Sequence, residues 1–204
     1  MDNFAENTAQ LLDRLKEDKD GVFTSLVGRY HHGLVAVATT MLGAGEAEDA
    51  VQSAWISAYG AIERFEGRSS IRTWLYRIVV NEARMRLRRG GREVSLTVDT
   101  DEADALSDRF RADGHWEPGP RRWDWTSPEE LLQEQDLLDC LRKHLGRLPE
   151  SQRLVVLLRD VQGLEFDDIC NTLELEASNV RVLLHRGRVT LFRMVDDYQE
   201  TGKC

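Results

Sequence analysis

The sequence predicts an all-α fold, made of two small helical domains and a flexible acidic linker between them. Nearly every apolar pattern in the 204 residues repeats with a helical period, and strand-like alternation occurs only around residues 94–98. From residue 93 to 127 the helical period is lost, and glycine, proline and acidic residues are frequent. We therefore expect one domain over residues 7–92, a linker over 93–127 and a second domain over 128–197.

The first block is expected to form four helices. The run Gly43-Ala44-Gly45 favours a break between the second and third helices, and a polar run ending in Ser69 and Ser70 favours a break before the fourth. The two serines are also good N-cap residues. The expected helices are Thr8–Lys16, Gly21–Leu42, Ala47–Glu63 and Ser70–Arg89.

The second block begins with a clear helix start. Ser127 is a good N-cap, Pro128 suits the first helical position, and Glu129 and Glu130 place acids in the first turn, where the helix dipole favours them. The expected helices of this block are Pro128–Leu145, Pro149–Val161, Glu165–Thr172 and Ala177–Asp196.

The charge is segregated along the chain, although the net charge is −9. Residues 83–92 hold five arginines and no acids, and residues 177–195 hold four arginines, one histidine and no acids. Between them, residues 99–117 hold seven acids and two arginines. This pattern indicates two nucleic-acid contacts joined by a segment that avoids nucleic acid or imitates it.

Metal, disulfide, membrane and enzyme chemistry have little support in the sequence. The three cysteines, Cys140, Cys170 and Cys204, are far apart and odd in number, which favours neither a disulfide framework nor a zinc site. Adjacent His31 and His32 diverge by about 100° on a helix, which favours packing over metal binding. We expect no cofactor and no metal. Without a long apolar run or a secretory pattern, we expect a cytoplasmic protein. No phosphate loop or nucleophile–base pair indicates an enzyme.

A helix-turn-helix is predicted near residues 165–193. Phe166, Ile169, Cys170 and Leu173 form one buried stripe, and a short turn leads to a second helix. The apolar face of that helix is predicted to leave a basic face outside, whose guanidinium groups match guanine or phosphate. A solvated amphipathic helix is the simpler alternative. The outer face contains Ser178, Arg181, Val182, His185, Arg186, Val189 and Arg193.

The fourth helix of the first block predicts a second nucleic-acid surface. Its polar stripe can follow a phosphate backbone, and Asn81 offers both a donor and an acceptor to a base. The nearby aromatic residues Phe65, Trp74 and Tyr76 either support unstacked bases or pack in the core. The predicted buried face holds Ile71, Trp74, Leu75, Ile78 and Met85, and the stripe holds Thr73, Arg77, Asn81, Arg84 and Arg88.

Together these motifs resemble bacterial sigma factors of the extracytoplasmic-function group. In the first block, residues 48–52 and 64–78 with Asn81 are similar to sigma region 2. In the second block, Leu148–Arg153, Gly163-Leu164, Asn179–Arg181 and His185–Arg188 are similar to region 4. The resemblance implies a sigma factor that directs core RNA polymerase to promoters and promotes DNA melting.

The resemblance also implies roles for particular residues of region 2. The β′ clamp helices of the polymerase would be bound by Glu48, Asp49, Val51 and Gln52. The −10 element would be captured as a single strand by Gly67, Ser69, Ser70, Thr73, Arg77, Asn81, Arg84 and Arg88. Ser53 departs from the family pattern, because an acidic residue is frequent at its position.

Region 4 would bind the β flap and read duplex DNA at the −35 element. Arg153 and Arg188 would hold phosphates, and Glu176 would be a weaker N-cap than the usual serine or threonine. The linker would thread the nucleic-acid channel of the polymerase. The resemblance also implies a monomer without membrane insertion that an anti-sigma factor holds inactive. The base-reading helix would use Ser178, Asn179, Arg181, Val182, His185 and Arg186.

An alternative is a helix-turn-helix transcriptional regulator with an N-terminal sensing or dimerisation domain. The first block discriminates between the two hypotheses, because a sensing domain has no need of an arginine–asparagine stripe. A regulator should bind promoter duplex alone, whereas a sigma factor should need core polymerase.

Overall fold

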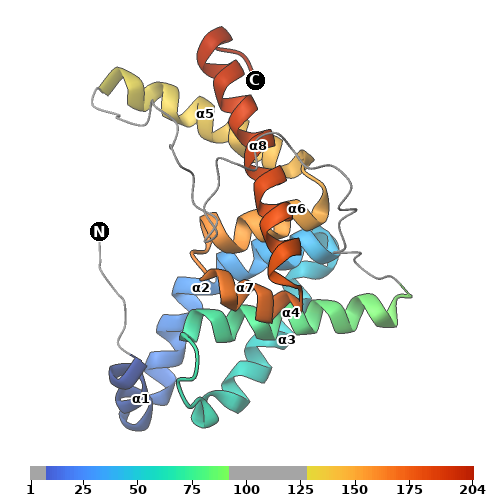
Figure 1. The fold of residues 1–204 in the computed structure, drawn as a ribbon. Coiled ribbons are helices and arrows are strands. Elements are labelled where there is room, and N and C mark those ends of the chain that lie inside the picture. Colours follow the sequence, from blue (N-terminus) through green and yellow to red (C-terminus); the bar gives the residue numbers. More distant parts are fainter. Residues whose placement is uncertain (1–7, 92–127) are drawn as a thin grey trace. The chain divides into compact units, whose positions relative to one another are not determined.

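The computed structural model describes residues 8–91 and 128–204, and every regular element in these two ranges is a helix. The expected all-α class is therefore confirmed (Figure 1). Ser127, the segment around 94–98 and the whole of the expected linker over 93–127 lie outside the described residues. The chain forms two compact units. Among the described residues, the first contains 8–91 together with Gln162–Glu174, and the second contains 128–161 and Leu175–Cys204.

The first unit is built on three helices that pack against one another, α2 (Lys19–Leu42), α3 (Ala44–Ala61) and α4 (Ile71–Arg89), with α1 (Thr8–Glu17) against α2. Asp18 caps α2 by accepting a hydrogen bond from the Gly21 amide at 2.9 Å. The break between α2 and α3 consists of one residue, Gly43 (φ 80°), which alone leaves the helical conformation. The expected break over Gly43-Ala44-Gly45 was thus too long.

Small side chains let α3 pack closely against α2 and α4. Ala47, Ala50, Ala54 and Ala58 recur on one face of α3 and are all buried. Because alanine adds only a methyl group, the backbones of neighbouring helices can approach closely along this face. The rest of α3 therefore carries the side chains that face outward, and a short 3-10 turn, η1 (Ile62–Arg64), ends it.

Helix α4 begins as expected, but its buried face is rotated from the predicted one. Ser70 is the N-cap and its hydroxyl accepts a hydrogen bond from the Thr73 amide at 3.0 Å. Trp74, Ile78 and Met85, which were expected in the core, are only half-buried. The buried residues of α4 are Ile71, Thr73, Leu75, Tyr76, Val79, Val80, Ala83 and Leu87.

Besides α2 and α3, a further helix packs on α4 and covers part of its predicted polar stripe. Helix α7 (Phe166–Leu173), far along the chain, belongs to the first unit and contacts α4. The helical wheel could not show this contact, since it reports only the period of one helix. α7 begins after Glu165 and ends at Glu174, whose left-handed φ of 51° stops the helix.

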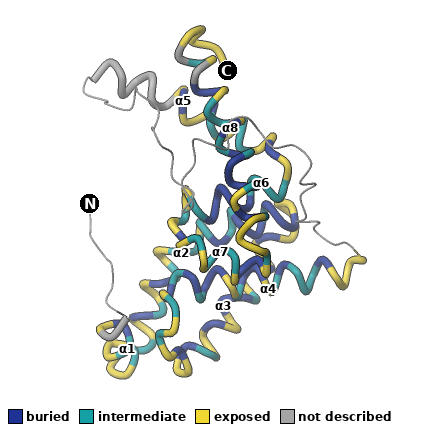
Figure 2. Tube along the Cα trace, viewed as in Figure 1, coloured by how far each residue is buried: buried dark blue, intermediate teal, exposed yellow. Residues whose placement is uncertain are grey.

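The second unit contains α5 (Pro128–Arg147), α6 (Glu150–Val156) and α8 (Ala177–Thr201), with α5 and α6 both packed against α8. The expected helix over 149–161 divides into α6 and a π-helical turn, η3 (Leu157–Val161). Buried leucines and valines fill this segment (Figure 2). Gly187 allows the close approach of α6 and α8, because a Cβ there would lie 2.7 Å from Val156 Cγ2.

The cysteines differ from their expected roles. Cys140 of α5 and Cys204 after α8 form a disulfide, although 64 positions separate them, so the expectation of no disulfide was wrong. Spacing along the chain could not show it, because only the packing of α5 on α8 brings the two residues together. Cys170 is half-buried rather than part of the core. Within the described ranges, no helix is long and apolar enough to cross a membrane.

Candidate core-polymerase and nucleic-acid interfaces

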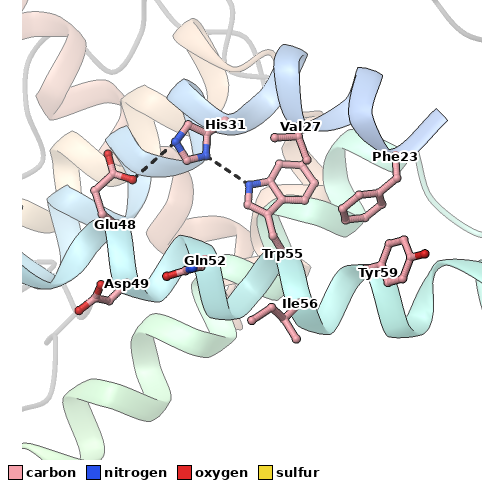
Figure 3. Close-up of a pocket in the computed structure, with 9 residues that line it drawn as sticks. All are labelled: Phe23, Val27, His31, Glu48, Asp49, Gln52, Trp55, Ile56 and Tyr59. Carbon is pink, nitrogen blue, oxygen red and sulfur yellow. Dashed lines mark hydrogen bonds and ion pairs between the residues drawn. The ribbon is translucent and has the colours of Figure 1, made fainter. Parts of the chain in front are cut away.

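A groove of about 610 Å³ lies between α2 and α3 in the first unit. Its floor and walls are mainly apolar, and Figure 3 shows Phe23 and Val27 of α2 facing side chains of α3. Two of its members are unusually open for their type, since Ile56 is 70% exposed and Tyr59 is 41% exposed. Exposed large apolar side chains grouped in a groove are typical of a protein interaction site. The groove is lined by Phe23, Val27, His31, Glu48, Asp49, Gln52, Trp55, Ile56 and Tyr59.

Ring contacts and polar contacts fix the walls of the groove. The Phe23 ring meets Trp55 and Tyr59 edge to face, with centroids 5.3 and 5.0 Å away. Trp55 Nε1 donates to His31 Nδ1 at 3.4 Å, and His31 Nε2 lies 3.5 Å from a Glu48 carboxylate oxygen (Figure 3). The aromatic rings are therefore held in place before any partner binds.

The far end of the groove is tied by a second set of polar contacts. The Tyr59 hydroxyl donates to Asp20 at 2.7 Å, and this hydrogen bond raises the pKa of Tyr59. Lys19 lies over the Tyr59 ring and binds Glu63 at 2.9 Å, a hydrogen bond that raises the pKa of Lys19. These contacts fix the Tyr59 ring at the end of the groove.

Three of the four residues expected to bind a protein partner line this groove, namely Glu48, Asp49 and Gln52. The fourth, Val51, is fully buried, because it lies on the alanine face of α3. At 100° per residue, position 51 points about 200° away from position 49. The sequence reasoning missed Ile56 and Tyr59, although positions 49, 52, 56 and 59 share one helical face and could have revealed them.

The start of α3 is also fixed from behind. Arg86 of α4 donates to the Asp49 carbonyl and to Ser53 Oγ, both at 2.9 Å, and pairs with Glu82 at 2.9 Å. Ser53, which departs from the family pattern, thus takes part in holding α4 against α3. These bonds fix the part of α3 that carries the groove carboxylates of Glu48 and Asp49.

The predicted polar stripe of α4 is divided in the structure. Arg77, Asn81 and Arg88 are exposed. Thr73 is 5% exposed, and its hydroxyl donates to Asp168 of α7 at 2.8 Å. Arg84 is half-buried against the same helix. The sequence predicted one continuous surface, but two of its five residues, Thr73 and Arg84, contact α7 instead of solvent.

Arg84 binds the carboxyl end of α7. It donates to the Thr172 carbonyl at 3.5 Å and to the Leu173 carbonyl, and it lies 3.5 Å from the Glu174 carboxylate. These carbonyls have no partner within the helix, and a cation is favoured at this end of the dipole. Arg84 thus acts as a C-terminal cap for α7.

Two further contacts join the segment before α7 to α4. Arg72 donates to the Gly163 carbonyl at 2.9 Å, and the Tyr76 hydroxyl donates to Gln162 Oε1 at 2.5 Å. Burial raises the pKa of Tyr76 well above its usual range, so the phenol remains a donor. Together with Thr73 and Arg84, these side chains hold residues 162–174 along most of α4.

The loop before α4 brings three predicted residues together. Gly67 has a φ of 71°, a conformation that favours glycine, and Ser69 and Ser70 follow it. Phe65 at the start of the loop is 6% exposed and stacks at a tilt on Trp74, with centroids 5.4 Å apart. Tyr76 is 1% exposed. Phe65 and Tyr76 therefore pack in the core, and only half-buried Trp74 retains an open edge.

On α8, the predicted base-reading residues differ in exposure. Ser178 and Arg181 are exposed, Asn179, Val182 and Arg186 are half-buried, and His185 is 9% exposed. Val189, which the wheel placed on the outer face, is 4% exposed, so that expectation was wrong. Glu176 is the N-cap and makes no side-chain cap hydrogen bond, as expected of a weaker cap.

The two arginines expected to hold phosphates have partners within the second unit. Arg188 binds both carboxylate oxygens of Asp160, with Nε at 2.9 Å and an Nη at 2.5 Å. Arg153 donates to the Gly146 carbonyl at 2.9 Å. The bidentate Arg188–Asp160 pair also ties α8 to η3, so Arg188 has a role in positioning α8.

Two family models match the chain, in the expected order. Sigma-70 region 2 matches residues 26–93, and Sigma-70 region 4 matches residues 138–191. The first match spans the α4 stripe and every groove residue except Phe23. The second spans η3, α7 and most of α8.

Several curated proteins are similar over nearly the full chain. The ECF RNA polymerase sigma-E factor of Escherichia coli (strain K12) is 31% identical over 179 residues, which is 87% of this chain and 88% of that protein. The RNA polymerase sigma-H factor of Pseudomonas aeruginosa is 30% identical over 185 residues, covering 90% and 91% of the two chains.

Two solved structures share the fold. One is CnrH in complex with the cytosolic domain of CnrY, with a TM-score of 0.51, 19% identity and coverage of 92% of this chain and 96% of that chain. The other is the sigma factor RpoE of Bartonella quintana in complex with the anti-sigma factor NepR, with a TM-score of 0.54, 21% identity and coverage of 85% and 96%.

Proposed function

Because this chain belongs to the extracytoplasmic-function group of RNA polymerase sigma factors, we propose that its two units divide the work of initiation between polymerase binding, melting and promoter reading. A sigma factor is a transcription initiation factor and not an enzyme. We assign core-polymerase and −10 binding to residues 7–92, the channel-threading linker to 93–127 and −35 binding to 128–197.

Core polymerase is bound by the groove between α2 and α3. The observation that carries this assignment is the exposed apolar pair Ile56 and Tyr59, which lies beside the carboxylates of Glu48 and Asp49. An apolar contact with a charged rim fits an amphipathic partner helix that carries basic residues, as the β′ clamp helices would supply. Gln52 stands between the two parts and can donate and accept.

The loop at Gly67 and the exposed part of α4 take the melted −10 strand. Arg77, Asn81 and Arg88 are exposed along α4, and the basic last turn of the helix holds no acid. Guanidinium groups can hold the phosphates, while Asn81 can pair with a base edge. The full set is Gly67, Ser69, Ser70, Thr73, Arg77, Asn81, Arg84 and Arg88.

Region 4 reads the −35 duplex from the first half of α8. Arg181 and Arg186 supply forked donors that suit guanine or phosphate, and Val182 supplies an apolar contact. Ser178, Asn179 and His185 complete the reading set, while Arg153 and Arg188 hold phosphates. The bond of Arg188 to Asp160 supports a second role for Arg188, in holding α8 in position.

Partners beyond polymerase and DNA follow from the family. We propose that an anti-sigma factor controls this chain, since one structural neighbour, the sigma factor RpoE, was solved with the anti-sigma factor NepR. We further propose that the chain is monomeric, is not inserted into a membrane and acts in the cytoplasm, where the polymerase and the promoters are.

Run-off transcription with purified core polymerase tests the function. We expect specific transcripts from a genomic fragment library only when this chain is added to core, and no duplex promoter binding by the chain alone. Failure to direct initiation from any fragment would contradict the proposal. Tight binding of promoter duplex without core would favour an ordinary helix-turn-helix regulator instead.

A matched pair of arginines tests the reading role of α8. Arg186→Ala should weaken recognition of the −35 element by about 1–3 kcal/mol and relax its base preference. Arg193→Ala, two turns further along α8 and exposed, is the control. Competition between promoter variants measures the preference. An unchanged preference in Arg186→Ala would remove that residue from base reading.

A further inference from the structure

The disulfide between Cys140 and Cys204 involves none of the residues assigned to the surfaces above. Their Cα atoms are 5.5 Å apart, within the usual range for bonded cysteines. Cys140 is 2% exposed and packs with Leu137, Met194 and Val195, and its sulfur lies 3.3 Å from Met194 Sδ. Cys204 is exposed. One sulfur is therefore fixed in a small apolar cluster, while the other can be reached from solution.

A small hollow gives reagents access to this pair. It has a volume of about 350 Å³ and is lined by Asp136, Asp139, Lys143, Tyr198 and Gly202 beside the two cysteines. The ligand atoms of Cys140, His144 and Cys204 all lie within 4.8 Å of one another. Desolvation lowers the pKa of His144, and the neighbouring Arg147 and Lys143 lower it further. A neutral imidazole beside the sulfurs can accept a thiol proton.

We propose that Cys140 and Cys204 are a reversible oxidation site that staples the carboxyl end of α8 to α5. The inference rests on the proposed cytoplasmic function, because thiols there are kept reduced and a disulfide is formed and removed as conditions change. The oxidant is a hydroperoxide and the reductant is a dithiol. The bond closes a loop that contains α6, η3, α7 and the whole of α8.

The chemistry balances in two steps. The Cys204 thiolate attacks one oxygen of hydrogen peroxide, the O–O bond breaks, and the products are a sulfenic acid on Cys204 and, after protonation of the leaving hydroxide, one water. The Cys140 thiol then attacks the Cys204 sulfur. The S–S bond forms, the S–O bond breaks, and the thiol proton, passed through His144, leaves with hydroxide as a second water. A dithiol returns two electrons and two protons and becomes a disulfide itself.

A metal site is the competing reading of the same residues. Two thiolates and an imidazole also suit Zn²⁺. The structure favours the disulfide, since the two sulfurs are bonded to each other and a bonded sulfur has no thiolate to offer. Retention of zinc is therefore one outcome of the test.

The test uses the full chain, first reduced and then treated with hydrogen peroxide. Oxidation should lower the intact mass by 2 Da without forming dimers, and a maleimide should label three cysteines before and one after, since Cys170 lies outside the pair. Peptide mapping should recover a Cys140–Cys204 crosslink. Reduction should lower the Tm of the transition that reports the second unit by roughly 10 °C.

Matched variants separate the site from general thiol chemistry. Cys204→Ser changes an exposed residue, so the chain should fold, but the mass and the Tm should no longer respond to peroxide. Cys170→Ser should respond like the parent chain. His144→Gln should slow disulfide formation severalfold and leave its final extent unchanged.

Several results would overturn the inference. They are the absence of an intramolecular crosslink after peroxide, crosslinking only between two chains, a Tm that does not change with the disulfide, and one equivalent of Zn²⁺ retained by the reduced chain. None of these measurements involves polymerase. If the chain initiates transcription but forms no disulfide, only this inference is contradicted. If the chain forms the disulfide but does not initiate transcription, only the proposed function is contradicted.

Discussion

The groove and the α4 stripe are two surfaces of the same unit, and they are presented in opposite ways. The groove is open, with Ile56 and Tyr59 exposed and its rings held by hydrogen bonds. The stripe is partly covered, because α7 occupies Thr73 and Arg84. One surface is ready for a partner, while the other has to exchange an internal partner for an external one.

This difference predicts an order of events. A surface held in its binding conformation loses little entropy on association, so the groove should meet its partner first. The covered stripe binds DNA at full strength only after α7 has left α4, and that separation requires free energy from another contact. We therefore expect core polymerase to bind before the stripe becomes fully accessible.

The largest effect is expected from placing a charge in the open groove. Ile56→Asp should raise the Kd for core polymerase roughly 30-fold, or about 2 kcal/mol, because an apolar contact is lost and a carboxylate is desolvated. Ser57→Asp puts the same charge on the next residue, which is exposed and outside the groove. Fluorescence anisotropy with labelled chain measures both. Equal affinities would remove Ile56 from the interface.

A smaller effect is expected on the exposed part of the stripe. Asn81→Ala should reduce open-complex formation about five- to thirtyfold, the loss of one or two hydrogen bonds to a base, without changing the Kd for core polymerase. Permanganate footprinting reports the melted bases. Intact melting with the normal −10 preference would show that Asn81 does not bind the strand.

A third substitution tests whether α7 is held on the α4 stripe. Asp168→Ala removes the acceptor of the Thr73 hydroxyl, so α7 should open from α4 more often by about 1 kcal/mol, roughly fivefold. Asp167→Ala removes an exposed neighbouring acid and is the control. Hydrogen–deuterium exchange of Phe166–Leu173 measures the opening. Identical exchange in the two variants would mean that the Thr73–Asp168 bond does not hold α7.

The smallest effect is expected in alkaline solution. Burial raises the pKa of Tyr76 in the folded chain, whereas an unfolded tyrosine titrates near 10. Above pH 10 the unfolded chain loses a proton that the folded chain keeps, so this group lowers stability as pH rises. Tyr76→Phe should therefore show a shallower fall of the urea midpoint between pH 9 and 11. Parallel curves for the two chains would contradict it.

Much of the fold could be predicted because helices leave local signals. The Ser70 cap, the end of α2 near residue 43 and the weak cap at Glu176 each depend on a few neighbouring residues, and all three stand in the structure. The packing of α7 on α4 and the Cys140–Cys204 bond depend on residues far apart in the chain. Periodicity carries no information on such pairs, and both were missed.

The candidate site was predicted in part for the same reason. Charged and polar members such as Asp49 and Asn81 were found because their residue types indicate partners. Ile56 was missed, since an apolar residue is expected inside until its face is known. Val51 was assigned outward and Val189 was placed on the outer face, although both are buried. These errors come from reading one helix without the helices that pack on it.

Gly187 has a consequence for anyone who wishes to rewrite the promoter preference of this chain. Because Gly187 has no Cβ, α8 packs closely against Val156 and the Gln152 carbonyl. The contact that positions the helix is therefore separate from the side chains that read DNA. A helix transplanted from another sigma factor should keep its angle if it carries glycine here, whatever stands at Arg181, Val182 or Arg186. A transplanted helix with alanine at this position should tilt away from Val156, so that its base-reading side chains would face the wrong base pairs.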